Sequence, residues 1–300
     1  MAPLIRPARA EDLRTAQDLV TRSINDLTER HGFGPMASAR PVDFQLFSLN
    51  DDPDGLWVAE ADGEIVGFTS SWVNDDFWFL AELFINPRRQ GDGTGGALLA
   101  RTFEHARKAG ARNRALITFT FNTVSQGLYI KHGLFPRLPL YFFRAECGAL
   151  KERPGLERLR AVDMTDAPGQ SELLVRLDQS ALGFSRDKHH RFLRSDGTVR
   201  DILLYRENHC VGYVYVSASG HIGPLAVMQR DDMGVAFATA LDIAAEGGAS
   251  HVSAFLPGTN AASLAIASAC GMRITFPMVL MSAEEFGDWQ RYLPRNPGFM

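Results

Sequence analysis

The sequence has few cysteines, no long apolar run and no excess of positive charge. Its three cysteines, Cys147, Cys210 and Cys270, lie far apart and without a histidine at metal-ligand spacing, which argues against a zinc site or a disulfide framework. A net charge of -4 offers no basic footprint for a phosphate backbone. No stretch approaches the roughly 18 unbroken apolar residues that span a membrane, and the amino terminus has no apolar signal region. We therefore expect a cytoplasmic protein with no bound metal and no membrane or nucleic-acid partner.

Length and composition favour an ordinary folded protein of two domains. Since a domain usually has roughly 100 to 200 residues, 300 residues correspond to about two. With 45% hydrophobic and 22% charged residues, the chain carries no low-complexity tract that would indicate disorder. The starting class is thus an enzyme or a binding protein.

The first half alternates helical and strand patterns. Apolar residues at three-to-four spacing predict one or two helices over 10–32, and Asp62-Gly63 supplies the turn of a hairpin. The glycine at 110 is typical of a helix end. Strands are expected at 56–60, 65–73, 77–85, 116–121 and 138–144, and helices at 96–108 and 123–131. Residues 25–55 carry no motif that we can interpret.

A similar plan restarts after a segment typical of a linker. Residues 148–156 combine Gly, Pro and charges, so we expect domains at 1–147 and 155–300. In the second half, helical patterns cover 164–195, a helix ends near 246 and another starts at 260, with strands at 202–216 (a hairpin), 221–227, 252–255 and 273–281. The fold class is therefore α/β with a mixed sheet in each half.

One fixed spacing supports duplication of the plan. Asn122 precedes Gly133 by eleven residues, in a strand, turn and helix context, and Asn260 precedes Gly271 by the same interval. Self-similarity at a fixed offset indicates an internal repeat.

A glycine-rich loop follows the strand at 77–85. Gly91, Gly93 and Gly95 lack β-carbons, so backbone N–H groups can approach a pyrophosphate, and the helix after them adds unpaired amides and its positive dipole end. A dinucleotide-binding loop is disfavoured because residues 86–90 intervene and the next strand does not end in an acid. A Walker loop lacks its Gly-Lys-Ser/Thr.

These residues resemble the GNAT superfamily of N-acetyltransferases. Its acyl-CoA signature is Gln or Arg, two residues, Gly, one residue, then Gly or Ala, and Gln90-x-x-Gly93-x-Gly95 fits it. A second motif of that family, an Asn, a small residue, a Tyr and a Gly, is matched by Asn122, Ser125, Tyr129 and Gly133. The likeness is good over residues 4–145, and the second half is similar to a degenerate copy, which implies two tandem GNAT-like domains.

The resemblance implies a site for acetyl-CoA in the first half. It implies that the strand segment 82–86 splays from its neighbour and contacts the pantetheine and the acetyl carbonyl, and that the loop amides bind the pyrophosphate. The implied cofactor-binding residues are Phe84, Ile85, Gln90, Gly91, Asp92, Gly93, Thr94, Gly95, Gly96, Asn122 and Ser125. For Asn122, capping of the following helix is a competing interpretation.

Two side chains are candidates for the chemistry. Acyl transfer to an amine needs a deprotonated amine and a reprotonated thiolate. The family's tyrosine falls on Tyr129, which suits the general acid, although a helix aromatic packed on the sheet is the alternative. Glu82 interrupts an apolar strand, where a carboxylate is costly unless paired or functional. It is either the general base or a structural partner of backbone amides or an arginine.

Other polar and aromatic residues have plainer interpretations. Arg88 and Arg89 either contact the CoA phosphates or are solvated. Trp72, Trp78 and Phe79 are expected in the core rather than in an acceptor pocket. The pair His189-His190, beside charged neighbours, is interpreted as a solvated helix face without a role.

The second half is expected to do no chemistry. Under the eleven-residue correspondence Ala267 takes the position of Tyr129, and residues 227–234 place two carboxylates where a pyrophosphate would lie. We expect one acyl-CoA per chain and a small-molecule primary amine as acceptor. A protein or peptide amine, or a non-catalytic acyl-CoA sensor, stays as an alternative, and the protein is a monomer or a homodimer.

Overall fold

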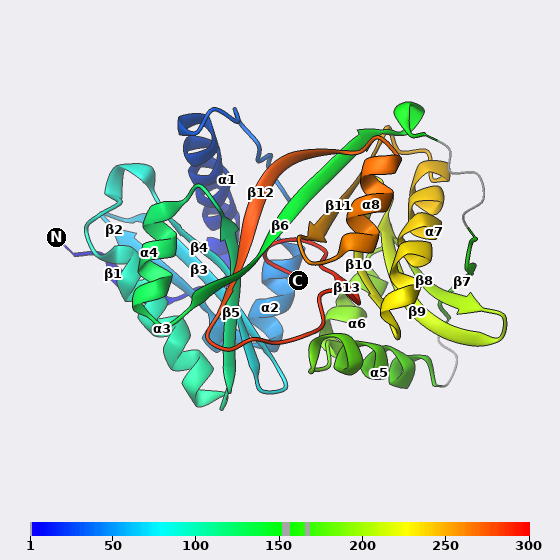
Figure 1. Cartoon of the computed structure of the whole chain (residues 1–300). Coiled ribbons are helices and arrows are strands. Elements are labelled where there is room, and N and C mark those ends of the chain that lie inside the picture. Colours follow the sequence, from blue (N-terminus) through cyan, green and yellow to red (C-terminus); the bar gives the residue numbers. More distant parts are fainter. Residues whose placement is uncertain (1, 152–156, 166–168) are drawn as a thin grey trace. The chain divides into compact units, whose positions relative to one another are not determined.

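The computed structural model divides the chain into two compact units. The structure describes residues 2–151, 157–165 and 169–300. The first unit comprises Met1–Phe135 and Met281–Glu284, and the second comprises Pro136–Leu280 and Glu285–Met300. Each unit is a mixed α/β structure, so the predicted fold class is confirmed (Figure 1).

The division between the units falls earlier than the expected boundary near residue 147. Strand β6 (Phe135–Glu146), expected to close the first domain, pairs antiparallel with β11 (His251–Pro257) from Leu140↔Pro257 to Glu146↔His251. That ladder places β6 in the second unit. Part of the expected linker, residues 152–156, lies outside the described residues.

The first unit places five sheet strands between two pairs of helices. Its strand order is β1-β2-β3-β4-β5, antiparallel except for the parallel pair β4 and β5. The elements are β1 (Leu4–Pro7), η1 (Ala10–Asp12), α1 (Leu13–Arg30), α2 (Asp43–Asp51), η2 (Pro53–Gly55), β2 (Leu56–Ala61), β3 (Glu64–Asn74), β4 (Phe77–Ile85), η3 (Pro87–Arg89), α3 (Thr94–Lys108), β5 (Asn113–Phe119) and α4 (Thr123–Lys131).

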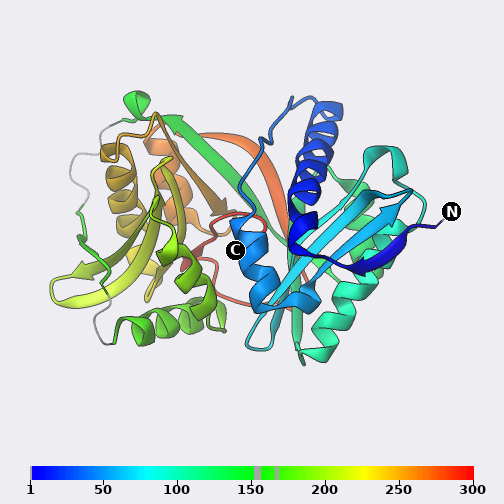
Figure 2. The ribbon, with the colours of Figure 1, turned by 180° about the vertical axis from the view of Figure 1, so that it is seen from behind.

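Strand alternation assigns these helices to opposite faces of the sheet. Leu56 and Val58 of β2 pack in one apolar cluster with α1, whereas Ala59 packs with Leu98 of α3. Accordingly α3 and α4 face the viewer in Figure 1, and α1 and α2 do so in Figure 2. The apolar stripe of α1 that the sequence predicted, Leu13, Ala16, Leu19 and Val20, is buried. Helix α2 lies in the segment that carried no interpretable motif.

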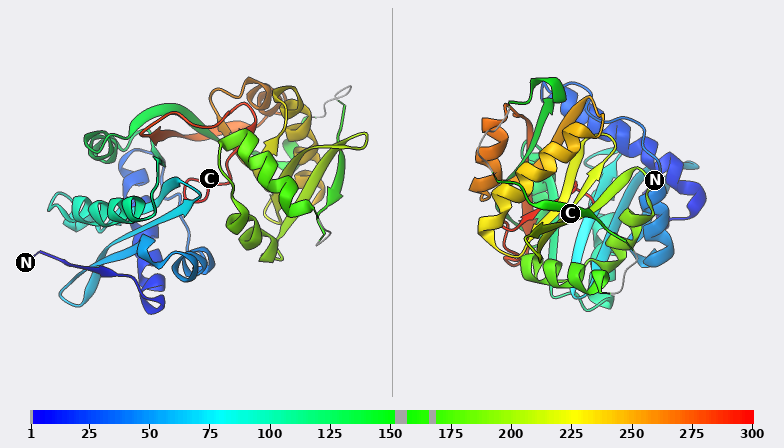
Figure 3. Two further views of the ribbon diagram at one scale, coloured as in Figure 1. Left: turned by 90° about the horizontal axis from the view of Figure 1, so that it is seen from below. Right: turned by 90° about the vertical axis from the view of Figure 1, so that its right-hand side faces the viewer.

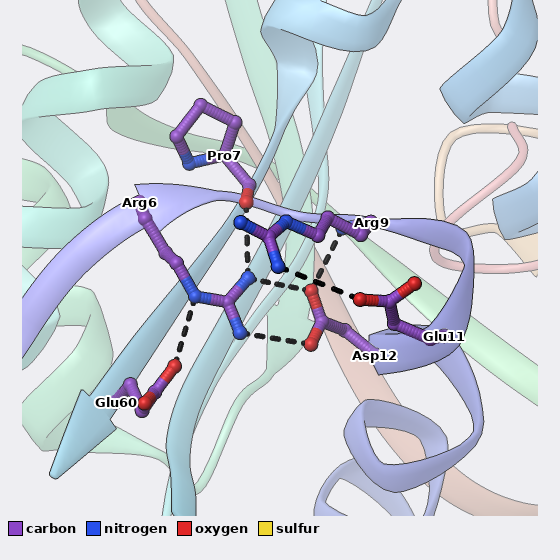
Figure 4. A network of polar contacts seen from close by, with 6 residues as sticks. All are labelled: Arg6, Pro7, Arg9, Glu11, Asp12 and Glu60. Carbon is purple, nitrogen blue, oxygen red and sulfur yellow. Dashed lines mark hydrogen bonds and ion pairs between the residues drawn. The ribbon is translucent and has the colours of Figure 1, made fainter. Parts of the chain in front are cut away.

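A charged network ties the amino-terminal strand to the start of α1 (Figure 4). The guanidinium of Arg6 donates to both carboxylate oxygens of Asp12, at 2.7 and 2.9 Å, and to Glu60 of β2 at 2.9 Å. Asp12 also accepts from the backbone N–H of Arg9 at 2.8 Å. This arrangement fixes the turn that delivers the chain into α1.

The second unit repeats the plan. Its strands lie in the order β12-β6-β11-β10-β9-β8-β7, with β10 and β11 parallel and β13 on β10. Its other elements are η4 (Cys147–Ala149), β7 (Arg160–Asp163), α5 (Gln170–Leu182), α6 (Asp187–Ser195), β8 (Val199–Arg206), β9 (His209–Ser217), β10 (His221–Val227), η5 (Arg230–Asp232), α7 (Met233–Glu246), α8 (Ala261–Ala269), β12 (Arg273–Ser282) and β13 (Tyr292–Leu293).

Helices also cover both faces of this second sheet (Figure 3). Val214 of β9 packs with α7 in the main apolar cluster of the unit. Tyr213 and Tyr215, which alternate with it, contact Asp178 of α5 and His190 of α6. The α5 and α6 side of the second sheet therefore corresponds to the α1 and α2 side of the first.

The eleven-residue spacing corresponds to a repeated local structure. Asn122 and Asn260 each cap a nine-residue helix by accepting from the N–H of the residue three positions on, Ser125 and Ser263. Both helices end in a turn with a positive φ, 76° at Gly133 and 83° at Gly271. The predicted correspondence of the two segments is thereby confirmed.

Candidate functional site

In the first unit, β4 leaves its parallel neighbour halfway along its length. The paired residues run from Phe77↔Asn113 to Leu80↔Leu116, while β4 continues to Ile85. At the same point Ala81 is an extra residue against β3, because Leu80 pairs with Ser71 and Glu82 with Ser70. Such a bulge increases twist and redirects a strand. Beyond it, no further β4–β5 pair is present among the described residues, so a splayed gap lies next to residues 82–85.

The glycine loop connects this gap to the start of α3. Gly91 and Gly93 have φ values of 93° and 89°, a conformation in which a side chain is strained, and a β-carbon at either would meet nothing within 4 Å. Glycine is therefore needed here for backbone conformation, and the space beside the loop is open. In the described part of the chain the N–H groups of Gly91, Gly93, Gly95 and Gly96 have no hydrogen-bond partner. Unpaired amides at a helix N-terminus fit an anion such as a pyrophosphate.

Side chains of the loop hold it against the end of β4. Asn86 accepts from the N–H of Arg88 at 3.1 Å, and Gln90 Nε2 donates to the carbonyl of Ile85 at 3.4 Å. Asp92 Oδ1 accepts from the N–H of Thr94 at 2.9 Å. Hydrogen bonds from Thr94 lower the pKa of Asp92, so this carboxylate stays ionised. A bound phosphate would meet the remaining loop amides.

Glu82 lies just after the bulge and is held by side chains from two elements. Ser70 Oγ donates to Oε2 at 2.9 Å, and Gln45 Nε2 of α2 lies 3.2 Å from both carboxylate oxygens. Burial raises the pKa of Glu82, and the hydrogen bonds from Ser70 and Gln45 and the charge of Arg40 offset part of that rise. None of the hydrogen bonds to the carboxylate oxygens in the described chain comes from a backbone amide or an arginine, the structural partners that we expected.

A carboxylate in this state is suited to proton uptake. A raised pKa brings the group closer to neutral pH, where a general base is most effective. The uncharged donors Ser70 and Gln45 orient the two oxygens without neutralising the charge.

Tyr129 lies on α4 and is nearly buried, with 5% of its surface exposed. Burial raises its pKa, and a hydrogen bond with the side chain of Ser125 offsets part of the rise. The phenol is therefore neutral at physiological pH and carries a proton to donate. Whether it acts as an acid stays a prediction, and its burial also fits the alternative of a packed aromatic.

The aromatic and arginine residues considered for the first unit differ in solvent exposure. Trp72, Trp78 and Phe79 are at most 2% exposed, which confirms the expectation that they are core. Arg89 forms an ion pair with Asp62 at 3.0 Å, and Arg88 is exposed. The capping role of Asn122 is observed, as described above.

The interpretation of His189-His190 as a solvated helix face is wrong. The two side chains are 1% and 2% exposed. His190 lies 2.8 Å from Asp178 through Nε2 and 2.8 Å from Tyr215 through Nδ1. Burial is tolerated because each ring nitrogen of His190 has a polar partner on α5 or β9. Arg191, one of the charged neighbours that suggested a solvated face, is exposed on the same helix.

Sequence reasoning also missed the partners of Glu82. Gln45 is 9% and Ser70 is 4% exposed, so both are buried polar residues in helix α2 and strand β3. A single glutamine in a short helix carries no pattern that predicts such a contact. The only signal was the isolated carboxylate itself, which required partners from somewhere in the chain.

Two absences are observed directly. Among residues 2–151, 157–165 and 169–300, no group of three His, Cys, Asp or Glu side chains is placed to hold a metal ion. Within the same residues, no helix has both the length and the apolar character needed to cross a bilayer.

Sequence comparisons connect the site to an enzyme family. Residues 21–134 match the model of the acetyltransferase (GNAT) family. An uncharacterized N-acetyltransferase of Archaeoglobus fulgidus is 38% identical over 68 residues, 19% of this chain and 44% of that protein. A putative [ribosomal protein bS18]-alanine N-acetyltransferase of Bacillus subtilis is 30% identical over 79 residues, 26% of this chain and 52% of that protein. The similarity thus spans about half or less of these curated relatives.

Structure comparisons extend over the whole chain. A putative acetyltransferase from Pyrococcus horikoshii aligns with 100% of this chain and 96% of its own, with a TM-score of 0.78 and 19% identity. The tandem GNAT protein from the clavulanic acid biosynthesis pathway aligns over 94% and 98%, with a TM-score of 0.61 and 17% identity. At these identities the likeness shows the fold, which is GNAT-like as predicted.

Proposed function

We propose that the first unit is an acetyl-CoA-dependent N-acetyltransferase acting on a primary amine. The observation that carries the proposal is the splayed strand β4, which ends in a glycine loop with unpaired amides at the start of α3. An open strand edge beside an anion site fits a ligand with an amide-containing arm and a pyrophosphate. Acetyl-CoA has both.

The binding residues follow from this geometry. The amides of Gly91, Gly93, Gly95 and Gly96, with the dipole of α3, take the pyrophosphate. Phe84 and Ile85, on the part of β4 that has left β5, lie along the pantetheine arm. Asn122 and Ser125, at the start of α4, face the same arm from the side of β5.

The reaction joins an amine nitrogen to the acetyl carbonyl carbon and breaks the bond from that carbon to sulfur. In the proposal the carboxylate of Glu82 accepts the proton lost by the amine, directly or through water. Tyr129 donates its phenolic proton to the leaving thiolate, and the proton balance is restored from solvent. Each step is of the general acid-base type, for which a positioned side chain contributes about 10²- to 10⁴-fold in rate.

The acceptor is proposed to be a small molecule in a cytoplasmic setting. The name of the Bacillus subtilis relative, which refers to an alanine of a ribosomal protein, supports a second candidate, a protein amine. A non-catalytic acyl-CoA sensor is the third, and it would need neither Glu82 nor Tyr129.

Release of thiol from acetyl-CoA, measured across a panel of small amines, polyamines and peptides, tests the proposal. Release with small amines supports the leading candidate, and release with peptides alone supports the second. Tight CoA binding with no release for any amine would leave the sensor and overturn the enzyme.

A further inference from the structure

The second unit contains the same splayed strand as the first. Strand β10 pairs in parallel with β11 only at His221↔Ser253 and Ile222↔Ala254. One extra residue then falls within Gly223-Pro224, because Ile222 pairs with Val216 and Leu225 with Val214 of β9. A bulge and the end of the parallel ladder coincide here, as they do at Ala81 of β4.

In this unit the gap is filled by the chain itself. Strand β13 pairs antiparallel with β10 through Leu225↔Leu293 and Ala226↔Tyr292. The N–H of Val227 adds a hydrogen bond of 3.0 Å to the carbonyl of Arg291. Both residues of β13 are fully buried. The backbone groups along this edge of β10, which would otherwise be unpaired, therefore form hydrogen bonds with β13 and Arg291.

Close approach of this segment depends on Gly223. A β-carbon at Gly223 would lie 2.8 Å from the carbonyl oxygen of Pro294 and 3.0 Å from the Cα of Arg295. The guanidinium of Arg295 donates to the carbonyl of Gly223 at 2.9 Å, and the ring of His221 contacts the carbonyl of Arg295. The segment is thus bonded to β10 on both sides of the bulge.

At the capping asparagine, too, a group of the chain itself lies where the first unit is open. In the first unit Asn122 uses its side-chain oxygen to cap α4, and within the described residues its Nδ2 has no partner. In the second unit Asn260 caps α8 in the same way, but its Nδ2 donates to the carbonyl of Trp289 at 3.0 Å. A peptide carbonyl of the chain therefore occupies the place where Asn122 is free to bind a ligand carbonyl.

The anion site is also altered in the second unit. Five residues (228–232) connect β10 to α7, whereas eight (86–93) connect β4 to α3. Asp232 lies at the start of α7 and forms an ion pair with Arg206 at 2.9 Å. The last residue with a parallel partner is Leu80 in β4 and Ile222 in β10, and the residues two positions later are Glu82 and Pro224. The side chain of Pro224 has no group that could replace the candidate base.

We propose that residues 286–295 are a built-in occupant of the second unit's acyl-CoA gap, with β13 in the place of the pantetheine arm and the Trp289 carbonyl on Asn260. The inference rests on the proposed function, since it takes the ligand of the first unit as acyl-CoA. The gap is filled by strand addition, in which backbone hydrogen bonds provide the affinity. The chain consequently binds one acyl-CoA.

Contacts on the α5 and α6 face fix this segment. Arg186, at the N-cap of α6, is fully buried and its guanidinium hydrogen-bonds to the hydroxyl of Tyr292. That hydroxyl donates to the carbonyl of Met300 at 3.1 Å, and the ring of Phe299 lies 4.6 Å from His189. His189 thus packs on Phe299, which follows the proposed occupant in the sequence.

Hydrogen exchange of the full chain with and without CoA tests the inference. CoA is expected to slow exchange in residues 82–96 and 122–129 and to leave 221–228 and 288–295 unchanged. The amide of Val227, which donates to Arg291, should exchange more than about a hundredfold slower than those of 229–231 even without CoA, because hydrogen-bonded ladder amides exchange only on local opening. The inference would be overturned if CoA slowed hydrogen exchange at 221–228, or if CoA accelerated exchange at 288–295 by displacing that segment.

A binding-deficient first unit separates the two proposals. In Gly95→Glu, calorimetric titration with CoA should show no binding, whereas the wild type should show one site. One remaining site in Gly95→Glu, or two in the wild type, contradicts the built-in occupant and leaves the proposed function standing. No binding to the wild type, with Val227 still protected, contradicts the proposed function instead.

Discussion

Ser70 Oγ donates a hydrogen bond of 2.9 Å to Glu82 Oε2, across the bulge at which β4 leaves β5. The bond places a carboxylate at the start of the splayed gap and orients it with a neutral partner. Because burial raises the pKa of Glu82 while Ser70 and Gln45 lower it, the ionised form is retained but costly. Activity and stability should therefore respond to this residue in opposite directions.

Replacing Glu82 with Gln should lower kcat by about 10²-fold or more, the usual size of a general-base contribution. In the wild type the rate should rise with pH through an apparent pKa above the usual glutamate value of about 4.3, and the variant should lose that limb. A pH-rate profile of both proteins checks this. An unchanged rate in Glu82→Gln would assign the residue a structural role.

The same substitution should raise stability at neutral pH. A carboxyl whose pKa is higher in the folded state than in the unfolded one favours folding when protonated, and that stability is lost as pH rises through the folded pKa. Gln resembles the protonated form, so thermal unfolding at pH 7 should shift upward in the variant. The two proteins should converge in acid, and a lower midpoint at pH 7 would contradict the assigned burial cost.

Tyr129→Phe should reduce turnover by about 10²-fold or more while CoA affinity changes little, because the phenol acts on the leaving thiolate rather than in binding. Tyr129 is buried and hydrogen-bonds with Ser125, so Ser125→Ala is a useful companion. It removes that hydrogen bond but keeps the acid, and we expect it to retain most of the rate. Equal rates for wild type and Tyr129→Phe would remove the phenol from the mechanism.

Two glycines at opposite ends of α3 form a matched pair. Gly93 and Gly110 have φ values of 89° and 71°, and a β-carbon at either meets nothing within 4 Å. Alanine at each should cost about 1 to 2 kcal/mol of unfolding free energy through backbone strain. Only Gly93→Ala should also lower the affinity for CoA, by about tenfold if the shift of the loop amides costs near 1.4 kcal/mol of binding free energy. An equal loss of CoA affinity in both variants would contradict the placement of the phosphate.

The Arg6–Asp12 ion pair predicts a separate dependence on acid (Figure 4). Its hydrogen bonds lower the pKa of Asp12, so the pair stabilises the fold above the unfolded pKa of about 4, and this contribution is lost as pH falls through the folded pKa. Asp12→Asn should cost about 1 to 2 kcal/mol at pH 7.

The exposed neighbour Glu11 provides the control for that variant. It pairs with Arg9 at 3.5 Å, and both side chains are largely solvated. Glu11→Gln should change the unfolding free energy by less than about 1 kcal/mol. Chemical denaturation at pH 7 and pH 3 separates the two variants, and equal losses at pH 7 would show that Asp12 has no special role.

The sequence predicted those features that depend on residues close together in the chain. The positive-φ glycines, the asparagine caps and the apolar stripe of α1 are all determined within one or two turns of chain. The β4 splay entered as an implication of the family likeness. Contacts between distant segments were not predicted: Gln45 on Glu82, β6 on β11, and the burial of His190 by Asp178 and Tyr215. Each depends on tertiary pairing, which sequence periodicity does not encode.

The boundary of the first domain shows this limit most clearly. The sequence predicted the last strand of the first half at 138–144, and the structure has a strand there, β6 (Phe135–Glu146). The unit to which β6 belongs depends on its pairing partner, and this partner, β11, lies more than 100 residues later in the sequence. A two-residue strand such as β13 is likewise too short to leave a pattern, although it fills the second gap.

The most direct test of the central claim is the amount of acetylated amine formed from acetyl-CoA by the wild type, Gly95→Ala and Gly95→Glu, measured together with the thiol released. We expect one thiol for each amide formed by the wild type and Gly95→Ala, and no product from Gly95→Glu, which retains its fold. Amide formation undiminished in Gly95→Glu, or none by the wild type with any amine, would contradict it.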